Sequence, residues 1–570
     1  MLSSISSLAV VPALCLIPIL ALAGPLLFRA VGALLGLYLR KKTDGRLSHI
    51  LELTEQDEKK WREGRRSSGS SSSSGKDEEW EEVDTYTVGT SGNGGKGEAD
   101  WDGVVGFFHP FCNAGGGGER VLWAAIRATQ QRWPKAKCIV YTGDHDVNKD
   151  AILSRVENRF NIHLHPPTVN FLYLTTRHWV LASTWPRFTL AGQSFGSLIV
   201  AWDAFSLLVP DIFVDTMGYA FALGLSKFLF PEIPTAAYVH YPTISTDMLE
   251  SLDPTSTVGS QGVHAGQGTG TRGKAKKLYW KLFAKVYSHV GASADVVMTN
   301  STWTMGHIQK LWGPLRRSNR PIAVVYPPVA VSELEQEVEV SPESEKKREK
   351  VLLYIAQFRP EKNHQLILQA FAEFVKTSKS PAAKEAKLVL VGSVRDDHDS
   401  KRVYQLRLLV NELHIKARVE FHLDASWPEI LEWLRRASVG VNGMWNEHFG
   451  IGVVEYQAAG LVSVVHDSGG PKMDIVVDVE GGFTGECNRA THGKSGADDV
   501  VTGFHATTPS EFAEGFEKAL SLENPLEVRL RARESAKRFT EEEFARRWVR
   551  EMEPVIGLNE LKVTTEKRRV

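Results

Sequence analysis

Short apolar runs alternate with longer amphipathic stretches along most of the chain. In the first half, the apolar runs that indicate buried strands are 104–108, 138–141, 211–214, 236–239, 296–299 and 323–326. Stretches such as 119–132 between them have helical periodicity. Strands that alternate with helices in this way are typical of a parallel sheet covered by helices.

The second half repeats the pattern. Its apolar runs are 351–355, 388–391, 419–421, 439–442 and 463–465. We therefore predict an α/β fold with two doubly wound, Rossmann-like domains at 101–334 and 351–540. Ligands bind at the carboxyl ends of the strands in such sheets, so two facing domains would hold a substrate in the cleft between them.

The amino terminus carries a different pattern. Residues 8–28 contain no charge, and the basic residues Arg29, Arg40, Lys41 and Lys42 follow them. This length and charge bias predict a single transmembrane helix within an anchor at 1–42, with the catalytic body in the cytosol. A cleaved signal peptide is the alternative, because 21–24 resembles a cleavage site, but the basic segment that should precede it is missing.

Several segments have the composition of linkers. Residues 43–100 are predicted to be a tether, disordered over the Ser/Gly-rich stretch 67–97. We also expect a flexible insertion at 256–277, a charged linker at 335–350, and a helix and tail at 541–570.

The overall charge and the cysteines give no sign of a nucleic-acid partner or a zinc site. Lys and Arg number 67 and Asp and Glu 68, so nothing indicates binding to nucleic acid. The four cysteines are far apart, which argues against a disulfide framework or a CxxC zinc site.

The first candidate site is a run of four glycines, Gly115, Gly116, Gly117 and Gly118, followed by Glu119 and Arg120. It lies between a predicted strand and a predicted helix. Glycine backbone can approach a ligand closely, and a helix N-terminus favours phosphate. The alternative is a tight turn, although four consecutive glycines exceed what a turn requires.

The second site follows the strand at 351–355. Arg359 and Lys362 lie three residues apart there, and two such cations can clamp a diphosphate and neutralise a departing nucleotide. A solvated basic turn is the alternative interpretation.

The third site follows the strand at 439–442. Glu447 could bind sugar hydroxyls, and Glu455 could accept from a ribose diol. Gly450 and Ile451 mark a helix start between them, where backbone can approach a ligand. His240 ends another predicted strand and is either catalytic or an ordinary structural histidine.

Two Asp-x-Asp patterns, at 144–146 and 397–399, match the loose metal motif of some transferases. Neither lies in a candidate site, so we expect both to be surface turns and expect no metal or other cofactor.

These motifs together resemble the retaining GT-B glycosyltransferases of family four. The longer strings 109–123, 238–248 and 445–452 resemble, within that group, the GDP-mannose:dolichol-linked oligosaccharide α-1,2-mannosyltransferases of asparagine-linked glycosylation. The resemblance covers about residues 100–555.

The resemblance implies addition of the fourth and fifth mannoses to a dolichol-linked oligosaccharide at the endoplasmic reticulum membrane, with the lipid bilayer and other mannosyltransferases as further partners. It implies that Arg359 and Lys362 hold the diphosphate of GDP-mannose. Glu447, with Phe449 and Gly450 beside it, would hold the mannose, and Glu455 the ribose. The glycine loop and His240 would lie at the interface of donor and acceptor. Another nucleotide sugar or lipid acceptor, or a non-catalytic scaffold, is the alternative.

Overall fold

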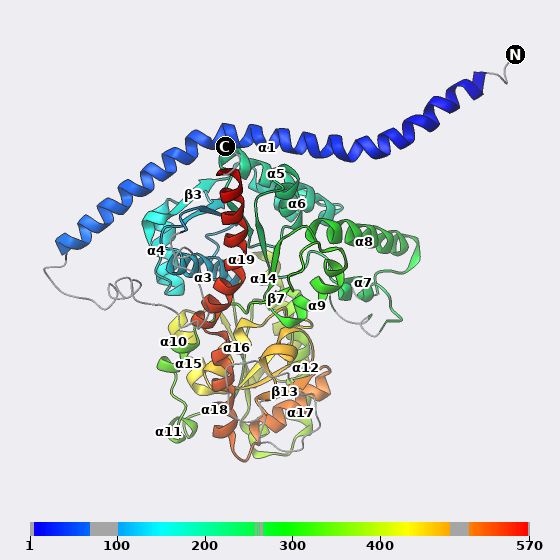
Figure 1. The fold of residues 1–570 in the computed structure, drawn as a ribbon. Coiled ribbons are helices and arrows are strands. Elements are labelled where there is room, and N and C mark those ends of the chain that lie inside the picture. The colour runs from blue at the N-terminus through cyan, green and yellow to red at the C-terminus, as the bar shows by residue number, and fades with distance from the viewer. Residues whose placement is uncertain are drawn as a thin grey trace.

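The computed structural model describes the backbone of residues 5–68, 101–256, 259, 262, 266–478 and 501–567. Over these residues the chain forms two parallel sheets, each covered by helices (Figure 1). The predicted α/β architecture with two Rossmann-like domains is confirmed.

The N-terminal sheet has the strand order β3-β2-β1-β4-β5-β6-β7, and every pair in it is parallel. Its strands are β1 Val104–Phe108, β2 Lys137–Thr142, β3 Val169–Tyr173, β4 Ile212–Asp215, β5 Thr235–Val239, β6 Val296–Thr299 and β7 Ala323–Val324. The central strands are continuous apolar runs because helices bury both of their faces.

Helices connect these strands. They are α3 Gly117–Arg132, α4 Lys149–Phe160, α5 Thr189–Leu207, α6 Ala220–Leu229, α7 Thr246–Ser251, α8 Gly270–Gly291 and α9 Thr302–Leu311. Two separate apolar clusters, one on each face of the sheet, form the core of this domain.

The C-terminal sheet has the order β10-β9-β8-β11-β12-β13, again all parallel. Its strands are β8 Glu349–Ile355, β9 Lys387–Gly392, β10 Val419–Leu423, β11 Ala437–Asn442, β12 Val462–His466 and β13 Gly503–Ala506. Its helices are α10 Val331–Glu337, α11 Pro342–Glu345, α12 His364–Thr377, α13 Pro381–Glu385, α14 Asp397–Glu412, α15 Trp427–Arg436, α16 Ile451–Ala458, α17 Pro509–Leu520 and α18 Pro525–Ala536.

In both sheets the strand order reverses next to the first strand of the domain, β1 or β8. Crevices at such switch points are where open α/β sheets bind ligands. The glycine loop follows β1 and the Arg359–Lys362 turn follows β8, so both lie at a switch point.

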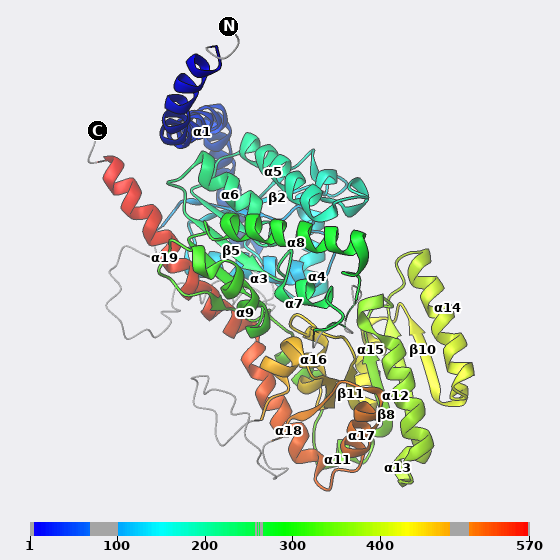
Figure 2. The ribbon, with the colours of Figure 1, turned by 90° about the vertical axis from the view of Figure 1, so that its right-hand side faces the viewer.

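The last helix, α19 (Glu541–Lys567), leaves the C-terminal domain and returns to the N-terminal one (Figure 2). There Trp548 is fully buried, and its Nε1 donates to Thr129 Oγ1 of α3 at 3.0 Å. The C-terminal helix expected at 541–570 is thus part of the core of the first domain.

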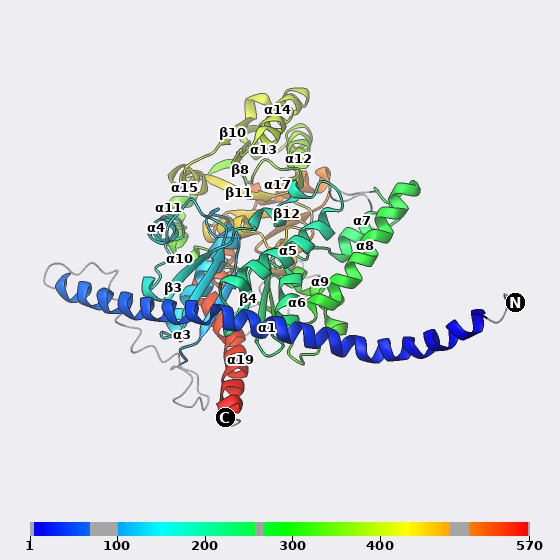
Figure 3. The same ribbon diagram turned by 90° about the horizontal axis from the view of Figure 1, so that it is seen from above.

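The first helix, α1 (Ile5–Ser68), is long and lies across the N-terminal domain beside α5 and α6 (Figure 3). The predicted span at 8–28 belongs to it, but the side chains of residues 5–23 lie outside the described part. A search of the described residues finds no helix with a stretch long and apolar enough to cross a membrane.

The predicted tether needs a correction, because residues 43–68 continue α1. The reason is packing on one helical face, where Leu39, Thr43, Ile50 and Thr54 are buried. Residues 69–100, with most of the Ser/Gly-rich stretch, lie outside the described residues.

Two other linker predictions were partly wrong. Residues 270–277 of the expected insertion form the start of α8, where Lys277 pairs with Asp253 at 2.9 Å. The charged stretch 335–350 contains α11 and the start of β8. Arg348 anchors it, because this buried guanidinium donates to the carbonyls of Leu434 and Ala459 at 3.2 and 2.8 Å.

Candidate active site between the two domains

The glycine loop joins β1 to α3 in a conformation that requires glycine. Gly115 has φ +77°, a region that side chains disfavour, and a Cβ there would overlap Arg159. The backbone N–H of Gly116 donates to Glu119 Oε2 at 2.5 Å, which closes the loop onto the first turn of α3. Burial raises the pKa of Glu119, and its carboxyl caps the helix rather than pointing to a ligand.

The next two glycines face the C-terminal domain and β5. A Cβ on Gly117 would lie 2.6 Å from Ile451 Cδ1, and one on Gly118 would lie 3.8 Å from His240 Nε2. The missing side chains therefore let the N-terminal loop come into contact with the start of α16.

On the opposite side of the cleft, Lys362 and Glu447 form an ion pair. Lys362 Nζ donates to Glu447 Oε2 at 2.5 Å, and both side chains are mostly buried, at 23% and 13% exposed. Burial would raise the pKa of Glu447, but the Lys362 charge and hydrogen bonds from Lys362 and Asn442 lower it overall. Glu447 is thus held as an ionised carboxylate beside a cation, a pair able to bind a sugar hydroxyl and a phosphate.

Glu455 lies one helical turn into α16, and a Cβ on Gly452 would lie 4.0 Å from its Oε2. Burial raises the pKa of Glu455, and Arg120 from the N-terminal domain opposes this shift. Arg120 itself donates to Glu541 Oε1 of α19 at 2.5 Å, and Arg127 donates to the same carboxylate at 2.8 Å. The structure therefore places Arg120 in an ion-pair network beneath the glycine loop.

The segment between the two glutamates acts through its backbone. The Phe449 side chain is buried away from the cleft, 5.8 Å from the ring of Tyr326 and 5.3 Å from that of Phe539. Gly450 has φ +107° and is the N-cap of α16, so the backbone amides after it point out of the helix end.

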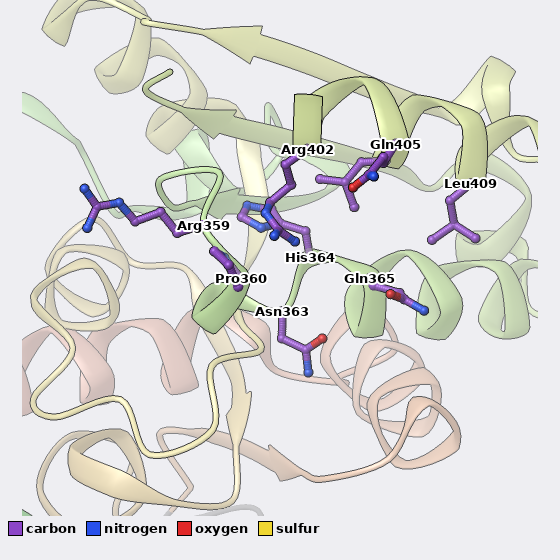
Figure 4. A pocket seen from close by; sticks show the side chains of 9 residues that line it. Arg359, Pro360, Asn363, His364, Gln365, Arg402, Gln405 and Leu409 are labelled. Carbon is purple, nitrogen blue, oxygen red and sulfur yellow. The ribbon is translucent and has the colours of Figure 1, made fainter. Parts of the chain in front are cut away.

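Arg359 lies apart from this group. It borders a cavity of about 330 Å³ between α12 and α14, and its guanidinium extends away from His364 and Arg402 (Figure 4). The contacts of the described side chains do not join Arg359 to Lys362 or Glu447. We predicted that Arg359 and Lys362 together clamp a diphosphate. In the structure Lys362 lies beside Glu447, whereas Arg359 borders the other cavity.

His240 is half-buried at the carboxyl end of β5, and within the described part of the chain its Nε2 has no hydrogen-bond partner. Burial lowers its pKa to about 4. His109, at the end of β1, has a pKa lowered to about 3, chiefly by burial, and its Nδ1 lies 2.7 Å from Thr216 Oγ1. Both imidazoles are neutral at physiological pH and offer hydrogen bonds without charge.

Direct contacts hold the domains together beside this site. The rings of Tyr241 and His448 stack at 4.0 Å, and Asn446 Nδ2 donates to Asp247 Oδ2 at 2.6 Å. Asp474 of the C-terminal domain accepts from the backbone N–H of Thr302 at 2.9 Å.

Sequence reasoning singled out none of these bridging residues. Four of them, Tyr241, Asp247, Asn446 and His448, lie within the strings that carried the family resemblance, which is the signal that could have found them. Asp474 follows a small-residue turn and carries no such signal.

The aspartates of the two Asp-x-Asp patterns interact with neighbouring protein groups. Asp144 pairs with Arg177, and Asp399 N–H donates to Asp396 Oδ1 at the start of α14. In the part of the chain that the structure describes, no three His, Cys, Asp or Glu side chains gather as they would around a metal ion.

Comparison with known proteins places these features in a family. Residues 102–312 match the family model described as ALG11 mannosyltransferase N-terminus, and residues 335–539 match glycosyl transferases group 1. A protein of Neurospora crassa named GDP-Man:Man(3)GlcNAc(2)-PP-Dol alpha-1,2-mannosyltransferase is 72% identical over 552 residues, 95% of each chain. The chain belongs to the ALG11 mannosyltransferase family.

More distant relatives agree. The proteins of the same name from Mus musculus and Homo sapiens are each 43% identical to this chain, over 80% and 77% of its length and 87% and 85% of theirs. Among solved structures, sucrose-phosphate synthase from Thermosynechococcus elongatus has a TM-score of 0.54 at 13% identity, covering 80% of this chain and 99% of its own. That likeness supports the two-domain fold alone.

Proposed function

We propose that this protein is a retaining α-1,2-mannosyltransferase that moves mannose from GDP-mannose to a dolichol-diphosphate-linked oligosaccharide, adding its fourth and fifth mannoses. The observation that carries the proposal is the 72% identity, over 95% of both chains, to a protein named for this reaction. The mostly buried Lys362–Glu447 pair at the sheet switch point supports it from the site itself.

Each proposed role follows from the chemistry of its residue. Lys362 neutralises the diphosphate, and Arg359 joins it there if its long side chain turns toward the cleft when the donor binds. Glu447 accepts from mannose hydroxyls and Glu455 from the ribose. His240 offers its unpartnered Nε2 to a sugar or acceptor hydroxyl from the N-terminal side of the cleft.

We propose transfer on the same face of the sugar. The C–O bond between mannose and diphosphate breaks, the acceptor hydroxyl forms the new bond, and its proton passes to the leaving phosphate. Lys362 stabilises the charge that grows on the diphosphate, so the scheme needs no metal. Glu447 takes no part as a nucleophile in this scheme, and a covalent glycosyl-enzyme trapped on Glu447 would contradict it.

The lipid acceptor implies a membrane location. We propose that the protein works at the cytosolic face of the endoplasmic reticulum, anchored through the uncharged segment 8–28 and the basic residues after it. Protease protection of tagged microsomes tests this orientation, and a protected C-terminus would contradict it.

The function is tested by incubating the full-length protein in detergent with GDP-mannose and a lipid-linked trimannosyl acceptor. We expect products heavier by one and two hexoses, both sensitive to an α-1,2-specific mannosidase. Competing nucleotide sugars test the donor. Transfer from another sugar nucleotide would favour the alternative transferase. Cellular glycan assembly that is unchanged in Lys362→Ala and Glu447→Ala variants would favour the scaffold.

A further inference from the structure

A second cavity, of about 590 Å³, lies between the domains beside the Lys362–Glu447 pair. Residues after β5 and from α9 line one side of it, and the 360–363 turn and residues 444–448 line the other. Its volume falls in the ~300–1,000 Å³ range of small-ligand pockets. Lys362, Glu447 and Glu455 are not among its lining residues, so it is a compartment next to the proposed donor site.

The lining combines aromatic rings with a few fixed polar groups. Tyr241, Trp303 and Trp445 supply the rings, and Asp247 and Asn446 supply a carboxylate and an amide. A pyranose has apolar faces of C–H groups and a rim of hydroxyls. Aromatic surfaces with convergent hydrogen-bonding groups match both parts.

Asp247 is held in place and stays ionised. Asn446 Nδ2 donates to its Oδ2 at 2.6 Å, and His307 Nε2 lies 3.5 Å from the same oxygen. Burial alone would raise the pKa of Asp247, but the hydrogen bonds from His307 and Asn446 lower it overall. A fixed carboxylate of this kind accepts hydrogen bonds from sugar hydroxyls.

Trp445 is half-buried and forms an outer wall. The backbone of Gly262, with φ +76°, lies against it so closely that a Cβ would be 2.5 Å from the indole ring. The ring is therefore packed against Gly262 on one side and borders the cavity.

We propose that this cavity binds the mannosyl end of the acceptor oligosaccharide and presents its terminal hydroxyl to the sugar held beside Glu447. Glu447 lies in the chain between the lining residues Asn446 and His448, so acceptor and donor would meet across one short loop. The inference rests on the proposed transferase function and adds the site for its second substrate.

The test compares Trp445→Ala with Trp427→Ala, in full-length protein. Trp427 is 47% exposed at the start of α15 and does not line the cavity, so it is a matched control. We expect Trp445→Ala to raise the acceptor KM by about tenfold, as loss of a central aromatic contact does. The KM for GDP-mannose and the Kd for GDP should stay within about twofold of wild type, as should all constants of Trp427→Ala.

A second variant covers the case in which Trp445→Ala does not fold. Asp247→Asn keeps the shape and removes the charge, and we expect it to raise the acceptor KM by about fivefold with unchanged GDP binding. The same shifts with a water-soluble oligosaccharide acceptor would show that the glycan is recognised. Shifts confined to the lipid-linked acceptor would overturn the inference.

The outcomes separate the two proposals. Wild-type protein that transfers no mannose would overturn the proposed function together with this inference. Normal wild-type transfer, with the acceptor KM unchanged in both variants, would overturn the inference alone.

Discussion

The two domains share a sheet topology but bring different chemistry to the cleft. The C-terminal domain supplies ionised groups, the paired Lys362 and Glu447. The N-terminal domain supplies glycine backbone and two neutral histidines, His109 and His240. The Lys362–Glu447 pair can therefore stabilise a charged nucleotide diphosphate, while the glycine loop and the two histidines can approach the sugar closely without adding charge. We call the C-terminal side of the cleft, with Lys362 and Glu447, the electrostatic half. We call the N-terminal side, with the glycine loop, the steric half.

The largest expected effect concerns the contribution of α19 to the core of the N-terminal domain. Trp548 of α19 is fully buried, and its ring stacks 6.3 Å from that of Phe107 on β1. We expect Trp548→Ala to lower the free energy of unfolding by about 3–5 kcal/mol, measured by chemical denaturation. If the loss matched that of the exposed control Trp427→Ala, α19 would not be part of this core.

The electrostatic half is tested by Lys362→Met and Glu447→Gln. Each should lower kcat by about 10²–10³-fold, because each removes half of the charged pair. Without Lys362, burial should also raise the pKa of Glu447. Steady-state kinetics should show the double variant to be little worse than either single one. Lys387→Met, which breaks an exposed pair with Glu420, is the control and should stay within about twofold of wild type.

Buried histidines make both domains sensitive to acid. His364 stacks on Phe358, and burial lowers its pKa from 6.5 to about 3. The unfolded chain binds the proton first, so the stability from this group is complete above pH 6.5 and is lost as the pH falls toward 3. At pH 5 the loss is about 2 kcal/mol.

His364→Leu removes that titration. Its stability should therefore fall less than that of wild type between pH 7 and pH 5, measured by thermal or urea unfolding at each pH. The exposed His289→Leu serves as control and should follow wild type. If the free energy of unfolding changed with pH equally in His364→Leu and wild type, His364 would not contribute to the loss of stability in acid.

The smallest expected effect concerns the steric half. Gly117→Ala adds a Cβ 2.6 Å from Ile451 Cδ1, so the Ile451 side chain at the start of α16 must move. We expect kcat/KM to fall about tenfold, equivalent to about 1.4 kcal/mol. Gly306→Ala has open space around its new Cβ and should show no loss. Equal activity of the two variants would mean that close approach at Gly117 is not needed.

Much of the fold followed from local pattern. Buried parallel strands are continuous apolar runs, so 104–108 and 296–299 were predicted with the bounds that β1 and β6 have. The edge strands β3 and β13 were missed. β3 is half-exposed beyond its first residue, and in β13 only Ala506 is buried, so neither forms the buried apolar run that the prediction relied on.

The sequence by itself determined which residues follow each strand, and therefore that the glycine loop, the Lys362 turn and Glu447 reach the cleft. Only the tertiary structure decided their partners. It paired Lys362 with Glu447 and left Arg359 beside another cavity, and it joined Arg120 to Glu541 across more than 400 residues. The physical reason is that strand and helix formation depends on neighbours in the chain, whereas the direction and burial of a side chain depend on distant segments packed against it.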